Sequence, residues 1–422
     1  MLALKKYLLR LPEKIWFRAM LFCVAAIAAA VAARWLGPLV PYTSDLELAS
    51  GSVGNLLTIL ASSMLAVIAF SVSIMISAFS SATSTATPRT ISLMLADDRS
   101  QNALSTFLGT FLFSIVGIIG LSAGFYTDRG RILLFFATIA VIAVITGTLI
   151  NWIQQLSTFG RISDLIKRVE QAAAKALEWH GKNPCLGAQP PVEIPDEAIA
   201  IGCDAASGLV TTIDMSALQD AAERHNVTVH LAIYPGKLVY PARQLLYLTG
   251  GNALEIDPEP FRNAILIERD RSFDQDPRFG LVVLSEIASR ALSPAVNDPG
   301  TAISVLNSGL RCFEAFADAR DTADHEPQYS RLHGAEIDLA DLFNDFFAKI
   351  ARDGAGVVEV QQRLQLCLLA LTRSWPDIFS SAAAHASRNA LARSTAAIGH
   401  GPDIEDLKTR SQMVVDADGG GR

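Results

Sequence analysis

Three long stretches of this chain contain no Asp, Glu, Lys, Arg or His. They lie between Glu47 and Arg89, between Arg99 and Asp128, and between Arg131 and Arg161. Charged side chains are costly inside a bilayer, so long segments without them are typical of membrane spans. The gaps therefore predict a membrane region in the first part of the chain.

Four apolar stretches are long enough to cross a bilayer as helices. They cover residues 15–35, 53–79, 103–126 and 132–153. About 20 residues, rising about 1.5 Å each, span a hydrocarbon layer about 30 Å thick. The sequence therefore predicts a bundle of four transmembrane α-helices over residues 1–156. A cleaved signal peptide is the alternative for the first stretch, because a basic arm precedes it and small residues end it.

Lysine and arginine are unevenly distributed between the two ends of these helices. Five of them lie within residues 5–18, whereas the first connection, residues 37–52, has none. Positive charge favours the cytoplasmic side, so both chain termini are expected in the cytoplasm. Arg129 and Arg131 in the third connection oppose this assignment, but Asp128 accompanies them and the N-terminal excess is larger.

Small and hydroxylated residues share one side of the second predicted helix. At about 100° per residue they fall within an arc of about 100°. Its polar members, here called the hydroxyl stripe, are Asn55, Thr58, Ser62, Ser73, Ser77, Ser80 and Ser84. Two interpretations stay open. The stripe packs closely against another helix, or it lines a weakly selective conduit in an oligomer.

The third predicted helix carries closely spaced glycines. Gly117, Gly120 and Gly124 are expected to allow close packing of helix against helix. No charged residue lies near the middle of any of the four helices, which argues against a proton relay, a voltage sensor or an ion-coupled carrier.

The remainder of the chain predicts a cytoplasmic α+β domain. Residues 157–195 form an amphipathic stalk that continues the fourth helix, followed by a linker rich in proline. Residues 196–269 form a small α+β unit, with a strand at 208–213 and a helix capped by Asp214 or Ser216. Residues 270–400 are expected to be helical, and residues 401–422 a disordered tail. The acidic face of a helix near residues 335–350 indicates a solvated surface.

Two phrases after residue 270 resemble a family signature. They are Gln275-Asp276-Pro277 and the run from Ala291 to Ala302, and Thr87-Pro88-Arg89 adds a further match. Together they resemble a bacterial family of predicted membrane proteins of unknown function, over essentially the whole chain. The resemblance implies a multi-pass protein of the bacterial inner membrane with four N-terminal helices and a cytoplasmic domain. It implies no activity.

The signature describes a helix, a break and a second helix. Asp276 is expected to cap the first helix and Asp298 the second. Arg290 could pair with Asp276, Asp298 or Glu286, and Asn297 could satisfy backbone groups in the turn. Two interpretations remain: a buried structural corner, or a ligand pocket that also includes Thr301.

Charge and cysteine usage exclude several classes of function. The net charge is −7 and no basic patch with interleaved aromatic residues occurs, so nucleic acid is not an expected partner. The five cysteines form no CxxC pair, so no metal site and no cofactor is predicted. No nucleotide-binding or hydrolase motif occurs, so no enzymatic activity is expected.

The leading hypothesis from the sequence is a homo-oligomeric channel, or a channel-like protein, with a cytoplasmic regulatory domain. The alternative is a membrane-anchored binding or scaffold module without transport activity. The lipid bilayer and further copies of the chain are the expected partners, and the sequence names no ion or small-molecule ligand.

Overall fold

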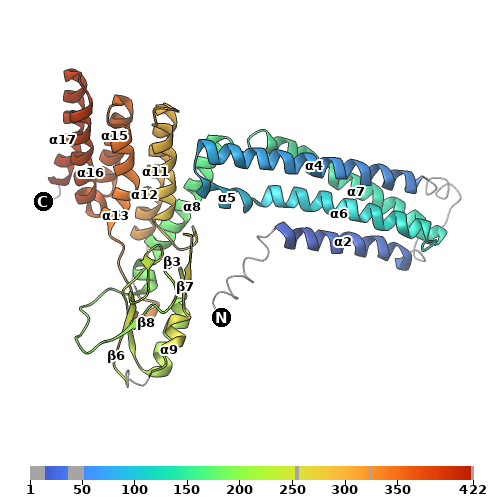
Figure 1. Cartoon of the computed structure of the whole chain (residues 1–422), viewed down its shortest axis with the longest axis horizontal. Coiled ribbons are helices and arrows are strands. Elements are labelled where there is room, and N and C mark those ends of the chain that lie inside the picture. Colours follow the sequence, from blue (N-terminus) through green and yellow to red (C-terminus); the bar gives the residue numbers. More distant parts are fainter. Residues whose placement is uncertain (1–14, 37–51, 252–255, 323–325, 420–422) are drawn as a thin grey trace. The chain divides into compact units, whose positions relative to one another are not determined.

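The computed structural model describes residues 15–36, 52–251, 256–322 and 326–419 (Figure 1). These residues divide into two compact units. The membrane unit lies within residues 6–84 and 91–164, and the C-terminal unit within residues 85–90 and 165–422.

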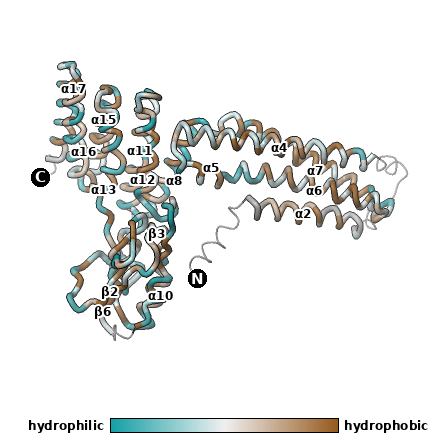
Figure 2. Tube along the Cα trace, viewed as in Figure 1, coloured by the Kyte–Doolittle hydropathy of each residue, from teal (hydrophilic) through white to brown (hydrophobic). Residues whose placement is uncertain are grey.

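The membrane unit is helical throughout its described part. Its helices are α2 (Ile15–Leu36), α4 (Val53–Thr85), α5 (Ile91–Leu95), α6 (Asp98–Ser122) and α7 (Asp128–Leu156). Among the described residues, α4, α6 and α7 are long and apolar enough to cross a membrane, and Figure 2 shows their hydrophobic residues in brown. The first predicted span coincides with the helix α2, in which the described apolar segment Ala19–Ala28 is shorter than a membrane span.

Polar caps explain why two of the spans begin earlier than predicted. The Asp97 carboxylate accepts the Ser100 N–H at 2.9 Å and starts α6, and the Thr127 hydroxyl accepts the Gly130 N–H at 3.3 Å and starts α7. Side chains that satisfy the free N–H groups of a first turn extend the helix into polar sequence. Hydropathy locates only the apolar part of each helix.

The helices of the membrane unit pack through a small apolar cluster and one polar contact. Leu57 of α4, Phe113 of α6 and Leu134 of α7 are buried together. The Trp152 indole N–H of α7 donates to the Ser71 hydroxyl of α4 at 2.9 Å, and both side chains are buried. Buried indole and hydroxyl groups need such partners, so this bond fixes α7 against α4.

The predicted stalk is not a continuation of the fourth span. The helix α7 ends at Leu156, and α8 (Ile162–Lys182) begins after a turn in which Gly160 has φ +80°. Glycine takes this left-handed conformation without a Cβ penalty, so it allows the chain to turn between α7 and α8. The amphipathic segment is therefore a separate helix.

The C-terminal unit contains two small sheets. The first has the order β1 (Ala188–Gln189), β8 (Tyr329–His333), β4 (Thr228–Leu231), β6 (Gln244–Thr249), β2 (Ile199–Gly202). The second has the order β5 (Leu238–Val239), β3 (Gly208–Ile213), β7 (Ile265–Glu268). Helix α9 (Met215–His225) is capped by Asp214, one of the two predicted caps. Val229, Leu246 and Phe261 belong to the core they share.

Residues 270–400, predicted to be all-helical, contribute one strand to the first of these sheets. Strand β8 pairs parallel to β4, with Leu332 opposite Val229 and buried. This partner lies about a hundred residues away in the sequence, so local periodicity does not reveal it. The remaining elements of the region are helical: α11 (Phe279–Ala291), α12 (Pro299–Asp321), α13 (Leu339–Phe343), a π turn η6 (Asn344–Ala348), α14 (Lys349–Asp353), α15 (Val358–Ser374) and α16 (Pro376–Ala397).

The segment predicted to be a disordered tail is instead a helix, α17 (Gly401–Gly419). It packs on α15 and α16 (Figure 1). Leu407 and Val414 are buried, and the buried Ser411 hydroxyl lies 2.7 Å from the Ser387 hydroxyl. The prediction failed because few apolar residues occur in this segment, although Leu407 and Val414 lie on the side of the helix that is covered.

Candidate functional site

Every member of the hydroxyl stripe on α4 is exposed in the single chain. Asn55, Thr58, Ser62, Ser73, Ser77, Ser80 and Ser84 are all solvent-accessible, as are Ala66 and Ala69 between them. The buried residues of α4 include Leu57, Met64 and Met75. At about 100° per residue these lie about 180° from the centre of the stripe. The stripe is thus the face that its own subunit leaves uncovered.

Three of the six hydroxyls of the stripe bond to their own helix. Thr58 donates to the Gly54 carbonyl at 2.9 Å, Ser62 to the Thr58 carbonyl at 2.9 Å, and Ser84 to the Ser81 carbonyl at 2.9 Å. Large apolar side chains flank the stripe on the exposed half of α4, among them Leu65 and Phe70. A narrow polar band between apolar edges therefore runs along α4.

Only one of the three predicted packing glycines makes the predicted contact. A Cβ on Gly117 would lie 2.8 Å from Leu57 Cδ1 of α4, so this glycine permits a close helix contact. A Cβ on Gly120 would lie 2.5 Å from Tyr126 Cε2, in the turn that follows its own helix. Gly124 lies beyond the end of α6 with φ +67°, and a Cβ there would have no neighbour within 4 Å, so this glycine serves the turn.

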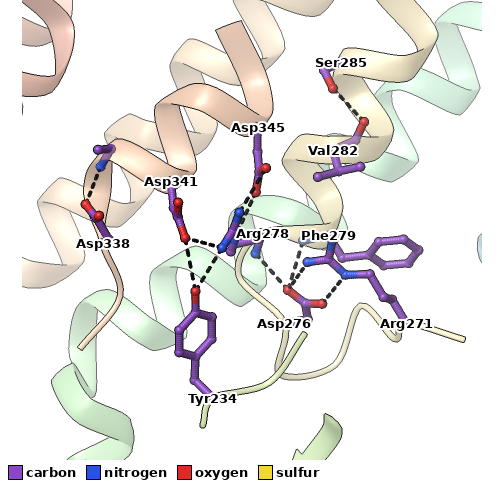
Figure 3. A network of polar contacts seen from close by, with 11 residues as sticks. Tyr234, Arg271, Asp276, Arg278, Phe279, Val282, Ser285, Asp338, Asp341 and Asp345 are labelled. Atoms are coloured by element: carbon purple, nitrogen blue, oxygen red, sulfur yellow. Dashed lines mark hydrogen bonds and ion pairs between the residues drawn. The ribbon is translucent and has the colours of Figure 1, made fainter. Parts of the chain in front are cut away.

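The signature residue Asp276 is buried and fully bonded. Its side chain is 1% exposed and accepts from Arg271 Nε at 2.6 Å and Nη2 at 2.8 Å (Figure 3). It also accepts the backbone N–H groups of Arg278 and Phe279, at 3.0 and 3.1 Å, and so bonds to the start of α11. The N-cap of α11 is Arg278, two residues after the predicted cap, because the helix begins at Phe279. Burial raises the pKa of Asp276, and the bonds from Arg271 oppose that shift.

Arg278, in the same turn, joins α11 to the segment predicted to be a solvated acidic face. Its Nε lies 2.6 Å from Asp345 Oδ2, and its Nη1 bonds to Tyr234 Oη at 2.9 Å and to Asp341 (Figure 3). Burial alone would lower the pKa of Arg278, but the contacts with Asp345 and Tyr234 raise it further above its usual value. The two aspartates thus form an ion-pair network with Arg278, which corrects the surface interpretation at these two positions. Glu336 and Asp338 of the same acidic face are exposed, as predicted.

The rest of the QDP phrase also connects separate elements. The Gln275 side-chain oxygen accepts the Ile213 N–H of β3 at 2.9 Å, and its carbonyl accepts from His180 Nε2 of α8 at 2.7 Å. Burial lowers the pKa of His180 to about 4, against the opposing effect of that carbonyl bond. A Cβ on Gly280 would overlap Ala173 of α8. Gln275 therefore joins β3 to α8, and Gly280 allows α11 to pack against α8.

The ALSPAVNDP phrase forms an exposed turn, so the predicted buried corner is wrong at this end. Arg290, Asn297 and Asp298 are exposed, and Asp276 lies at the opposite end of α11 from Arg290. Among the described residues, the Arg290 side chain makes no ion pair. The signature residues are separated because α11 keeps its two ends a helix length apart.

Local bonds explain the residues of this turn. Asn297 has φ +51°, a conformation that asparagine tolerates better than most residues. Asp298 caps α12 as predicted, accepting the Thr301 N–H at 3.0 Å and its hydroxyl at 2.6 Å. These bonds with Thr301 lower the pKa of Asp298. The turn uses its polar groups to start α12.

The Thr87-Pro88-Arg89 match also has a partner in the C-terminal unit. Arg89 Nη1 lies 2.5 Å from Glu286 Oε2 of α11, and the Thr87 hydroxyl lies 3.3 Å from the same oxygen. Lys349 Nζ lies 3.8 Å from the other Glu286 oxygen. The residues that directly follow α4 are thereby bonded to α11.

Sequence reasoning missed a polar cleft of about 680 Å³ in the membrane unit. Its described lining is Arg99, Asn102, Ala103, Thr106, Thr148, Asn151, Trp152, Gln154, Gln155 and Thr158. The signal was present as Arg99, Asn102 and Thr106, which have the spacing of one helix face. It was overlooked because these residues lie at the polar margin of an apolar span.

Comparison with known proteins places these features in a family. The family model described as predicted membrane protein (DUF2254) matches residues 12–370. Uncharacterized proteins of Mycobacterium bovis and Mycobacterium tuberculosis are each 26% identical over 280 residues, which is 61% of this chain and 51% of theirs. The chain thus spans about half the length of these curated relatives. No solved structure matches it. Because the family model covers most of the chain, the protein belongs to the DUF2254 family of predicted membrane proteins.

Proposed function

We propose that the protein is a homo-oligomeric channel of the bacterial inner membrane, in which the hydroxyl stripe of α4 lines the conduit. In this proposal α2 is the fourth span, both termini are cytoplasmic, and the C-terminal unit regulates conduction without an enzymatic activity. The observation that carries the proposal is the exposure of the entire stripe on the face opposite the buried side of α4.

The pattern on either side of the stripe supports an assembly around α4. Neutral hydroxyls give a polar lining without a fixed charge, and large residues such as Leu65 and Phe70 are positioned to pack between neighbouring copies. The helix of 33 residues is about 50 Å long at about 1.5 Å per residue, which exceeds the hydrocarbon thickness. A lining of this length could extend beyond the bilayer on one side.

The bonds at the end of α4 support control by the C-terminal unit. Glu286 of α11 holds Arg89 and Thr87, which follow α4 directly. A movement of α11 would therefore be transmitted to the end of the proposed lining helix. Glu286→Gln keeps the size of the side chain and removes the charge, so it should change how often the channel opens without changing its assembly.

A membrane-anchored scaffold without transport is the second candidate. The hydroxyls of Thr58, Ser62 and Ser84 are satisfied by their own helix, so these three positions could also contact lipid without unpaired donors. In that case α4 needs no second copy. Cross-linking and flux separate the two candidates.

Cross-linking tests the assembly. In a chain whose five native cysteines are replaced, Ser73→Cys should form an oxidised dimer between copies in the membrane. Thr146→Cys on α7 is the matched control, because Thr146 is likewise an exposed hydroxyl residue within a span. Equal cross-linking at both positions, or none at Ser73, would count against assembly through α4.

Flux tests the conduit. Liposomes containing the wild-type protein should conduct ions, and Ser73→Leu should abolish that flux while leaving the oligomer intact, because an apolar constriction dewets. Thr146→Leu should conduct as the wild type does. A wild-type oligomer that conducts nothing under varied voltage, tension and pH would favour the scaffold.

A further inference from the structure

The polar cleft of about 680 Å³ lies at one end of the two spans α6 and α7. Five residues, 123–127, join these helices, so they run antiparallel and the start of α6 meets the end of α7. The cleft thus has the depth in the membrane at which lipid headgroups lie. Its size is within the range of small-molecule sites, about 300 to 1,000 Å³.

Two side chains of the cleft are fixed by bonds within the unit. The Trp152 indole donates to Ser71 at 2.9 Å, and the Gln155 amide donates to Asp97 Oδ2 at 2.7 Å. Asp97 also accepts from the Ser100 N–H and hydroxyl, at 2.9 and 2.6 Å. The walls are therefore held in place, and the Asp97 carboxylate beside Gln155 accepts three hydrogen bonds.

Three other donors of the lining have no such partner. Within the described residues, the side chains of Arg99, Asn151 and Gln154 make no hydrogen bond and no ion pair. Together they offer one guanidinium and two amide groups to a ligand. No carboxylate is among the lining residues that the structure describes. A cation and amide N–H groups without a competing carboxylate make a site for an anion.

The position of Arg99 adds to this argument. It is the second residue of α6, where the positive end of the helix disfavours a cation. A bound anion would be stabilised by both the guanidinium and the helix end. The position of Arg99 at the start of α6 is therefore more favourable when an anion is bound than when the cleft is empty.

We propose that this cleft binds a phosphate-bearing anion, with Arg99 as the cation and Asn151 and Gln154 as amide donors. The phosphate could be the headgroup of an anionic phospholipid or a soluble phosphate ester, and both present the same chemistry. The site does not depend on the proposed conduction, because it lies on α6 and α7 and not on the stripe of α4.

Native mass spectrometry of the full-length protein tests the site. The protein is released from nanodiscs containing equal amounts of phosphatidylglycerol and phosphatidylcholine, and retained lipids are counted. Wild type should retain phosphatidylglycerol preferentially. Arg99→Gln should lower its retention about tenfold, the loss expected for one charge-assisted hydrogen bond. The matched control is Arg129→Gln, since Arg129 is also exposed and lies at the other end of these helices, and this variant should retain phosphatidylglycerol as wild type does.

A second variant and a second ligand decide the remaining cases. Gln154→Glu is nearly isosteric and should repel the anion, so it tests the site even if Arg99→Gln fails to fold. Selective retention that is lost in both variants supports the site with a lipid ligand. Binding of glycerol 3-phosphate to lipid-free protein, lost in the same variants, supports it with a soluble ligand. Equal retention of phosphatidylglycerol in wild type, Arg99→Gln and Gln154→Glu would overturn the proposal.

Discussion

Arg278 Nε lies 2.6 Å from Asp345 Oδ2, and this pair ties the first turn of α11 to the π turn η6. Arg278 is 19% exposed and Asp345 20%, so both charges are largely removed from water. A charge in such a position depends on its partner, because the partner replaces the lost hydration. The signature phrase thus contains a structural ion pair.

Removing this arginine should destabilise the C-terminal unit. Arg278→Ala leaves Asp341 and Asp345 without their common partner and should cost about 2 to 4 kcal/mol in the free energy of unfolding. Arg290→Ala, in the same helix but exposed, should change it by less than about 0.5 kcal/mol. Chemical unfolding of the detergent-solubilised protein measures both. Equal losses in the two variants would contradict the assignment of burial.

A methyl group on Gly280 should disturb the packing of α11 on α8. The Cβ added in Gly280→Ala would lie 2.3 Å from the Ala173 Cβ and 2.7 Å from the Ala173 Cα. Overpacking of this kind typically costs about 1 to 3 kcal/mol. Gly300→Ala in the first turn of α12 is the control, since its nearest neighbour is Asp298 Oδ1 at 3.4 Å. Thermal unfolding should separate the two, and an unchanged Gly280→Ala protein would contradict the close contact.

Stability should fall in mild acid because of His180. Its pKa of about 4 in the folded protein lies below the ordinary value of 6.5, so the unfolded chain binds the proton more readily in that interval. The stabilising contribution is complete above about pH 6.5 and falls through the interval down to about pH 4. The free energy of unfolding should therefore fall by about 2 kcal/mol between about pH 7.5 and pH 5.

The variant His180→Gln isolates this effect. Glutamine can donate to the Gln275 carbonyl but does not titrate. The difference in unfolding free energy between the two pH values should therefore shrink by about 2 kcal/mol in the variant. An identical pH dependence in both proteins would mean that another group titrates.

The last helix should contribute to stability. Leu407→Ala removes a side chain that is 1% exposed between α17 and its neighbours and should cost about 2 to 4 kcal/mol. Met413→Ala on the same helix is the control, because Met413 is 46% exposed and should matter little. Hydrogen exchange of residues 401–419 gives a second measurement. Rapid exchange along this segment in the wild type would support the disordered tail instead.

Labelling tests the expected membrane orientation. In a chain without native cysteines, a cysteine at Arg129 should react with an impermeant reagent added to intact cells, and one at Asp403 should react only after lysis. A probe at Ser44 should also react from outside, although this position lies outside the described residues. Labelling of Asp403 in intact cells would reverse the orientation.

The sequence alone determined the features that depend on local composition. Charge-free segments gave the spans α4, α6 and α7, because solvation by lipid acts on each helix separately. Alternation and capping predicted β3, α9 and the cap Asp298, because these depend on residues a few positions apart. The family followed from short specific phrases.

The tertiary structure alone decided which polar residues are buried. Asp276, Arg290 and Asp298 belong to the same signature, yet only Asp276 is buried. The start of α11 lies against β3, where Gln275 bonds to Ile213, whereas its other end leads into an exposed turn. Asp341 and Asp345 resemble surface residues until Arg278, more than 60 residues earlier, is placed against them. Such pairings depend on how distant helices pack, and periodicity within one helix carries no information about them.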